Sequence, residues 1–155
     1  TYIKFSLGGE QDEKNSNFNG FLIDYVFYSC KSDRGDKAQL TANEWQLKEM
    51  VTTAGKVQLP QQVLILVLTD TNMVYGFSGC NRLFGKYSTE GNTFKFSFLG
   101  GTRMSCPDMR IEQAFLKTLG QMTIYSIKNK ELKLTDKDKK QSMVFIPREP
   151  DQELK

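Results

Sequence analysis

The chain alternates short apolar runs with short polar runs, and several apolar runs place a hydrophobic side chain at every second position. That alternation is typical of β-strands that bury one face and expose the other. Polar, glycine-containing stretches between the runs predict turns, a loop at 55–60 and a charged linker at 31–39. The sequence predicts eight or nine short strands, at residues 2–7, 21–28, 44–51, 63–69, 73–77, 94–98, 122–127, 131–135 and 142–147.

Three phenylalanines give a clear strand signal. Phe94, Phe96 and Phe98 alternate with Lys95 and Ser97. Because successive side chains of a strand point to opposite faces, we expect all three rings on the buried face of one half-buried strand.

One segment has helical spacing and predicts a helix near residues 108–121. Pro107 suits its first turn, Asp108 complements the N-terminal dipole, and Gly120 is placed for a left-handed cap. Glu112 is expected to cap the helix, to lie on its surface or to pair with Arg103. Apolar side chains recur every three or four residues, at Ile111, Ala114, Phe115, Thr118, Leu119 and Met122.

Strands in succession with one helix exclude a doubly wound parallel sheet, which needs alternating helices. We therefore predict an α+β protein, mainly antiparallel, whose sheet curls into a partly open, cracked barrel with the helix covering an open edge or end. At 155 residues the chain allows one domain with a real core. The predicted division is a domain at 41–147, a charged tail at 148–155, and an N-terminal extension at 1–40 that holds two strands or the remnant of a preceding domain.

Composition narrows the chemistry. The chain has no histidine, which removes Ser-His and Cys-His nucleophile pairs and histidine-ligated zinc. Its net charge is only +3, and its lysines and arginines are spread along the sequence, so they do not form the basic cluster that is typical of nucleic-acid-binding proteins. The run at 136–141 is not a calcium-binding loop, because lysine occupies the fifth position and no glycine follows it. No apolar span is long enough for a transmembrane helix. We expect no catalytic residue, no cofactor and no metal site.

The segment 74–87 is interpreted as a glycine-rich bend where the sheet turns. Gly76, Gly79 and Gly85 allow positive φ or close backbone approach. Asn81 is expected to bond its own backbone and hold the loop. The segment is not a phosphate-binding loop, because its glycine spacing is one residue too long and Tyr87 replaces the magnesium-binding Ser or Thr.

The three cysteines leave alternatives open. Cys80 lies in the glycine-rich bend and Cys106 lies just before the helix. A bridge between them would contribute roughly 3.5 kcal/mol by the chain-entropy estimate. The alternatives are two buried thiols, or a reactive cysteine whose pKa the helix N-terminus lowers. Cys30 ends an apolar run that vaguely resembles a lipoprotein cleavage site, although a strand is the preferred interpretation.

An ordered set of motifs resembles the META domain of HslJ-like bacterial proteins over about residues 43–146. The motifs are Trp45-x-Leu47, Val74-x-Gly76-x-x-Gly79-Cys80-Asn81-x-x-x-Gly85-x-Tyr87, Thr102-Arg103-Met104-Ser105-Cys106-Pro107, Glu112-x-x-Phe115-Leu116-x-x-Leu119 and Leu132-x-Leu134. The resemblance implies a cracked barrel similar to that of secretin pilot proteins, which bind lipid and a partner peptide. It implies structural roles for these residues, is compatible with a Cys80–Cys106 bridge, and supplies no catalytic residue.

The resemblance also implies a place in the bacterial cell envelope, periplasmic, secreted or as an outer-membrane lipoprotein whose lipid anchor lies outside or upstream of this chain. Our functional expectation is a non-enzymatic protein that binds an envelope protein segment or a lipid or other apolar ligand, in envelope (heat-shock) stress, antibiotic tolerance or secretion. One alternative is a thiol-dependent or hydrolytic enzyme that uses Cys80 or Cys106. Another is a structural accessory module of a larger protein.

Overall fold

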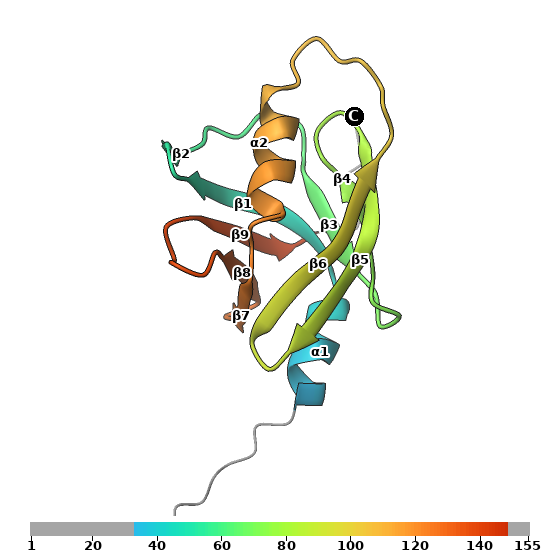
Figure 1. The fold of residues 1–155 in the computed structure, drawn as a ribbon, viewed down its shortest axis with the longest axis vertical. Helices are drawn as coiled ribbons and strands as arrows, with labels where there is room; N and C mark the ends of the chain where they lie inside the picture. The colour runs from blue at the N-terminus through green and yellow to red at the C-terminus, as the bar shows by residue number, and fades with distance from the viewer. Residues whose placement is uncertain (1–32, 149–155) are drawn as a thin grey trace, which may run out of the picture. The chain divides into compact units, whose positions relative to one another are not determined.

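The computed structural model describes residues 33–148 (Figure 1). The predicted strands at 2–7 and 21–28, Cys30 and the tail after residue 148 lie outside these residues. In chain order the elements are α1 (Asp33–Thr41), β1 (Glu44–Thr52), β2 (Gly55–Lys56), β3 (Ile65–Leu68), β4 (Met73–Phe77), β5 (Arg82–Glu90), β6 (Thr93–Gly101), α2 (Arg110–Leu119), β7 (Ile124–Lys128), β8 (Glu131–Thr135) and β9 (Ser142–Pro147).

Strand predictions from alternation hold where both the pattern and the flanking turns are clear. β1, β4, β8 and β9 coincide with the predicted ranges to within one residue, while β3 and β7 are shifted or shorter. The linker predicted at 31–39 is wrong, because α1 occupies most of it. Leu40 is fully buried in the core, and its carbonyl accepts a hydrogen bond from Trp45 Nε1 at 2.8 Å. These tertiary contacts stabilise a helix that the charged sequence did not suggest.

The strands form one antiparallel sheet that curls until its first and last long strands meet. Each strand from β3 to β9 pairs with the next, and β1 pairs with both β3 and β9. The weak point is the β6–β7 junction, whose ladder consists of the single pair Thr93–Ile124. The result is a ring cracked between β6 and β7, which confirms the predicted α+β fold with an open barrel.

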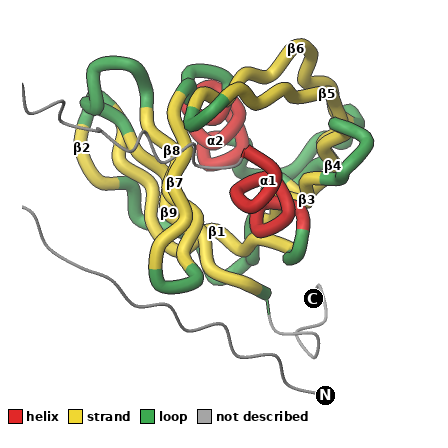
Figure 2. Tube along the Cα trace, turned by 90° about the horizontal axis from the view of Figure 1, so that it is seen from below, coloured by secondary structure: helices red, strands yellow, loops and turns green. Residues whose placement is uncertain are grey.

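α2 lies between β6 and the strands β8–β9 in both views (Figures 1 and 2), so that the helix fills the side of the ring where strand pairing fails. Phe115 and Leu119 of this helix are fully buried. They join a single core with Trp45, Phe94 and other side chains from the strands. The structure therefore places the predicted helix and its apolar face as expected.

A β-bulge redirects one of the three phenylalanines of β6. Tyr87 of β5 pairs with Phe96, but Lys86 pairs with Phe98, so Ser97 is an extra residue on β6. An extra residue reverses the alternation beyond it. Phe94 is fully buried, whereas Phe98 is 57% exposed. The prediction that all three rings share the buried face is wrong for Phe98.

The glycine-rich bend is shorter than predicted. Gly76 lies inside β4 and Gly85 inside β5, a strand that the sequence analysis did not identify. A Cβ at Gly76 would overlap the carbonyl oxygen of Ile65, and one at Gly85 would overlap that of Phe98. These two glycines therefore serve close strand approach, and the turn itself is confined to residues 78–81.

Tyr87 belongs to the core of β5 and not to the turn. Its ring stacks on Phe94 with centroids 5.4 Å apart, and its hydroxyl donates to the carbonyl oxygen of Thr69 at 2.7 Å. Burial, with a smaller contribution from the charge of Asp70, raises the pKa of Tyr87 to about 12.

This shift predicts a loss of stability at high pH. The folded-state pKa of Tyr87 lies above the ordinary value of 10.0, so its contribution is intact below pH 10 and is lost as the pH rises toward about 12. Over that range wild type should lose about 2 kcal/mol more than Tyr87→Phe, which has no phenol to ionise. Urea unfolding at a series of pH values measures the difference. Parallel stability curves for the two proteins would contradict it.

Candidate functional site

The structure joins Cys80 to Cys106 in a disulfide, with a Cα–Cα distance of 6.2 Å. Cys80 lies in the turn between β4 and β5, and Cys106 lies in the loop 102–109 that leads from β6 into α2. The bridge closes a loop across 26 positions of sequence and fixes the segment that crosses from the sheet to the helix. In this state neither sulfur is a free thiol.

Asn81 connects the same three segments by hydrogen bonds. Its Oδ1 accepts from Thr102 Oγ1 and from the Met104 N–H, both at 2.7 Å. Its Nδ2 donates to Glu112 Oε1 at 3.0 Å and to the Met104 carbonyl oxygen at 3.2 Å. The expectation that Asn81 bonds its own backbone is wrong, because its buried side chain instead ties the turn to the loop and to α2.

The turn itself is closed by Ser78. The Ser78 N–H and hydroxyl both donate to the carbonyl oxygen of Asn81, at 2.9 and 2.8 Å. Gly79 has a φ of 102°, which a residue with a side chain adopts at a cost. Cys80 and Asn81 are thus presented from a compact turn toward α2.

Glu112 supplies the helix side of this network. It lies in the first turn of α2 and is only 7% exposed. Its carboxylate accepts from the Asn81 N–H at 3.1 Å as well as from the Asn81 side chain. The partner proposed from sequence, Arg103, is exposed in the loop instead. Amide donors and the helix N-terminal dipole therefore stabilise this carboxylate, which forms no salt bridge within residues 33–148.

The start and end of α2 differ from the sequence prediction in detail. The N-cap is Met109, so Pro107 lies before the helix and not in its first turn. Asp108 Oδ1 accepts from the Arg110 N–H at 2.9 Å, and hydrogen bonds from Arg110 lower the pKa of Asp108 to about 2. Gly120 has a φ of −64°, so it is not the left-handed cap that the sequence suggested.

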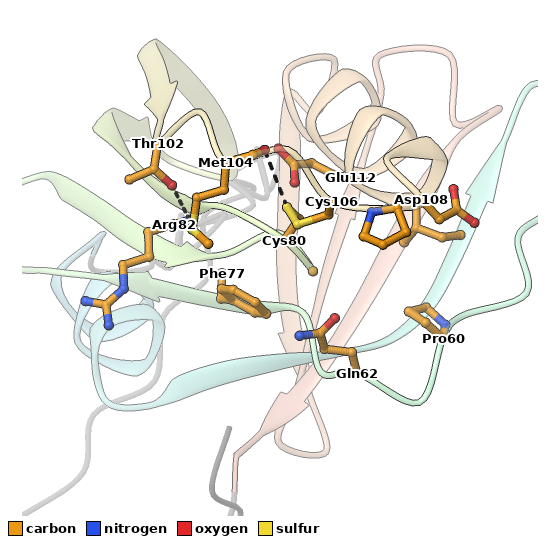
Figure 3. Close-up of a pocket in the computed structure, with 13 residues that line it drawn as sticks. Pro60, Gln62, Phe77, Cys80, Arg82, Thr102, Met104, Cys106, Asp108 and Glu112 are labelled. Carbon is orange, nitrogen blue, oxygen red and sulfur yellow. Dashed lines mark hydrogen bonds between the residues drawn. A yellow bond between two sulfur atoms is a disulfide. The ribbon is translucent and has the colours of Figure 1, made fainter. Parts of the chain in front are cut away.

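A surface groove of about 820 Å³ opens beside the disulfide. Figure 3 shows Phe77, Gln62 and Pro60 along one side, and Met104, the disulfide and Asp108 along the other. Met104 is 62% exposed and lines the opening. Most of the lining is apolar, and it comes from Pro60, Phe77, Met104, Pro107, Ile111 and the two half-cystines.

The structure brings only some of the sequence-derived motif residues to this groove. Gly79, Thr102, Met104, Pro107 and Glu112 line it, together with both cysteines of the Cys80–Cys106 bridge. Trp45 and Phe115 belong to the core instead.

Sequence reasoning missed the opposite wall, formed by Pro60, Gln62 and Phe77, and assigned Ile111 only to the helix core. The motif around Cys106 could have suggested one wall. Nothing in the sequence indicated what faces it.

In residues 33–148, no three His, Cys, Asp or Glu side chains gather as metal ligands would. The helices of this region include none with the length and hydropathy needed to cross a membrane.

Comparison with known proteins identifies the family of this chain. The sequence pattern of the META domain matches residues 38–150. No curated protein matches the chain. Among solved structures, one from Burkholderia xenovorans determined by NMR is 26% identical, with a TM-score of 0.61, over 72% of this chain and 87% of that one.

Two more distant structures share the fold. A protein solved by NMR is 18% identical with a TM-score of 0.54, over 70% of this chain and 92% of that one. The crystal structure of a DUF4847 family protein from Bacteroides vulgatus is 14% identical with a TM-score of 0.55, over 72% of this chain and 96% of that one. Because the META match covers most of the sequence, and its residues build both the cracked ring and the Asn81 network, this chain belongs to the META domain family.

Proposed function

We propose that this META-domain protein is a non-enzymatic binding protein of the bacterial cell envelope. It holds an apolar ligand or an apolar partner segment in the groove beside the disulfide. The observation that carries the proposal is a mostly apolar groove whose walls are fixed by the Cys80–Cys106 bridge and by Asn81.

The groove has the properties of a ligand site. Its volume of about 820 Å³ lies within the range typical of small-molecule pockets. Apolar side chains provide most of the contact surface, while Gln62, Arg82 and Asp108 supply a few polar groups that could orient a bound molecule. Since the disulfide and the hydrogen-bonded turn order the walls in advance, a ligand loses little binding energy to loop ordering.

The disulfide supports the proposed location. Such bonds persist in secreted and periplasmic proteins, whereas cytosolic thiols are kept reduced. A Burkholderia protein and a Bacteroides protein share this fold, which agrees with a bacterial source. Roles in envelope stress, antibiotic tolerance or secretion fit a protein that captures exposed apolar groups.

A thiol enzyme is the less favoured candidate. Cys80 and Cys106 are bonded to each other. A sulfur atom in a disulfide cannot act as a thiolate nucleophile. The chain also has no histidine that could activate a hydroxyl or thiol.

Binding of the neutral fluorescent probe N-phenyl-1-naphthylamine tests the groove. We expect saturable binding to the full chain and about tenfold weaker binding to Met104→Asp. The reason is that covering an exposed methionine side chain with the probe contributes about 1.5 kcal/mol to the binding free energy. Met104 holds the Asn81 network through its backbone, so the change alters the groove without removing those bonds. Ser105→Asp is the matched control, exposed and adjacent but outside the groove lining. Equal affinity for both variants would overturn the groove assignment.

Localisation is tested separately in the source bacterium. Osmotic-shock fractionation should recover the protein with envelope or secreted material, and alkylation before lysis should leave Cys80 and Cys106 unmodified. Recovery in the cytosol with both cysteines alkylated would contradict an envelope location.

A further inference from the structure

A second surface, beside the groove, carries exposed aromatic rings. Among the described residues, the large hydrophobic side chains with substantial exposure are Tyr75 at 46%, Phe84 at 43%, Phe98 at 57% and Met104. The first three lie on neighbouring strands, β4, β5 and β6. We call the outward side of these strands, with Tyr75, Phe84 and Phe98 at its centre, the aromatic face.

The strand registers explain how the rings come together. Tyr75 pairs directly with Phe84, whose other neighbour is Gly100. The β6 bulge turns Phe98 outward, and its ring lies over Gly100 with its centroid 6.2 Å from that of Phe84. A side chain at position 100 would collide with both rings. The bulge and the glycine thus build a continuous exposed apolar stripe, and an apolar patch with a polar rim is a mark of an interaction site.

Positive charges surround this stripe. Arg82, Lys86 and Lys95 are exposed on the same side of β5 and β6. Within residues 33–148 none of the three forms a salt bridge. The acid on this side of β5 is Glu90, at the strand end. The face is therefore apolar at its centre and cationic around it.

We propose that the aromatic face binds the surface of an anionic lipid membrane. Aromatic side chains enter the interfacial region of a bilayer, and lysine and arginine are attracted to anionic headgroups. A hollow of about 500 Å³ beside Tyr75, Arg82 and Phe84 leaves room for a headgroup, and Glu44, which also lines it, is paired with Arg148 at 3.0 Å. Phe77, Arg82 and Thr102 line both this hollow and the groove, so the two sites adjoin, while Tyr75, Phe84 and Phe98 lie outside the groove lining.

Other occupants fit the face less well. β4 and β5 are paired on both edges, so their backbones offer no hydrogen bonds to an added peptide strand. A strand added at the open edge of β6, which pairs with β7 at one position, would extend the sheet beside the aromatic face and would not cover it. A second copy docked face to face would oppose Arg82, Lys86 and Lys95 with the same cations. A membrane needs neither main-chain pairing nor shape complementarity, only apolar and cationic groups on one surface.

Sedimentation with lipid vesicles tests the proposal on the full chain. We expect binding to vesicles with about 30% phosphatidylglycerol in phosphatidylcholine, weakened by salt, and little binding to phosphatidylcholine alone. Lys86→Gln with Lys95→Gln should reduce binding about 25-fold, since each charge near an anionic surface contributes about fivefold. Lys117→Gln with Lys137→Gln removes the same charge from α2 and the β8–β9 turn, and should leave binding within about twofold.

A second variant tests the apolar part. Phe84→Thr with Phe98→Thr puts a residue that favours strands at both positions and should reduce vesicle binding about tenfold, while N-phenyl-1-naphthylamine binding in the groove is retained. Equal binding to neutral and anionic vesicles, or an equal loss in both lysine pairs, would overturn the proposal. If no vesicles are bound and the protein forms a dimer that the phenylalanine variant abolishes, the face binds a second copy of the chain instead. If vesicles are bound only after the acidic residues beyond Arg148 are removed, the face binds that tail instead.

Discussion

Asn81→Ala is expected to lower the free energy of unfolding by about 4 kcal/mol, the largest effect of any single substitution considered. The change removes the acceptor of Thr102 Oγ1 and of the Met104 N–H, and it removes the amide donors to Glu112. Glu112 is buried, so its carboxylate would lose partners that water cannot readily replace. Urea unfolding followed by the fluorescence of Trp45, the single tryptophan and a core residue, measures the loss.

Two comparisons isolate the network. Asn92→Ala makes the same chemical change at an exposed turn between β5 and β6, and should cost less than about 0.5 kcal/mol. A double-mutant cycle with Glu112→Ala should give a coupling energy of at least about 1 kcal/mol, because the two side chains share hydrogen bonds. Additive effects, or a loss below about 1 kcal/mol in Asn81→Ala, would show that the network contributes little.

Removal of the disulfide by Cys80→Ala with Cys106→Ala is expected to cost about 3.5 kcal/mol through the entropy of the unfolded chain. For a chain of this size that corresponds to a fall in Tm of about 10 °C. The same variant releases one anchor of the 102–109 loop, so binding of N-phenyl-1-naphthylamine in the groove should weaken as well. Thermal unfolding and probe titration measure the two effects.

Thiol counting and a cysteine control complete this experiment. Cys30→Ala keeps the bridge and should not show the probe-binding loss. Mass spectrometry after alkylation under denaturing conditions should find one modified cysteine in wild type, and all three only after reduction. Three modified cysteines without reductant, or a double variant as stable as wild type, would refute the stabilising bridge.

The sequence predicted elements best where one physical signal dominated. Period-two alternation with flanking turn residues located β1, β4, β8 and β9, and the helical spacing after Pro107 located α2. The sequence-based predictions were wrong where tertiary contacts overrode the local pattern of apolar and polar residues. α1 forms because Leu40 is buried by the sheet. β5 continues through Gly85 because glycine has no side chain to collide with the neighbouring backbone of Phe98.

The candidate site shows the same division. The sequence offered Cys80 and Cys106 as disulfide candidates, with free thiols as the alternative, and gave Met104 only a structural role. Both walls of the groove depend on which distant segments pack there. The partners of Asn81 and Glu112 could not be predicted, because 31 positions of sequence separate them and no local rule pairs an amide with a carboxylate at that range.

By itself the sequence determined the antiparallel class, the single principal helix and the family, since each follows from hydrophobic period, turn chemistry and an ordered set of residues. Only the tertiary structure decided where the ring is cracked, which side of β6 carries Phe98, and what surrounds the disulfide. The physical reason is that strand register and side-chain burial are collective properties. A single bulged residue reverses every side chain beyond it, and no local stretch of sequence encodes the neighbour across the sheet.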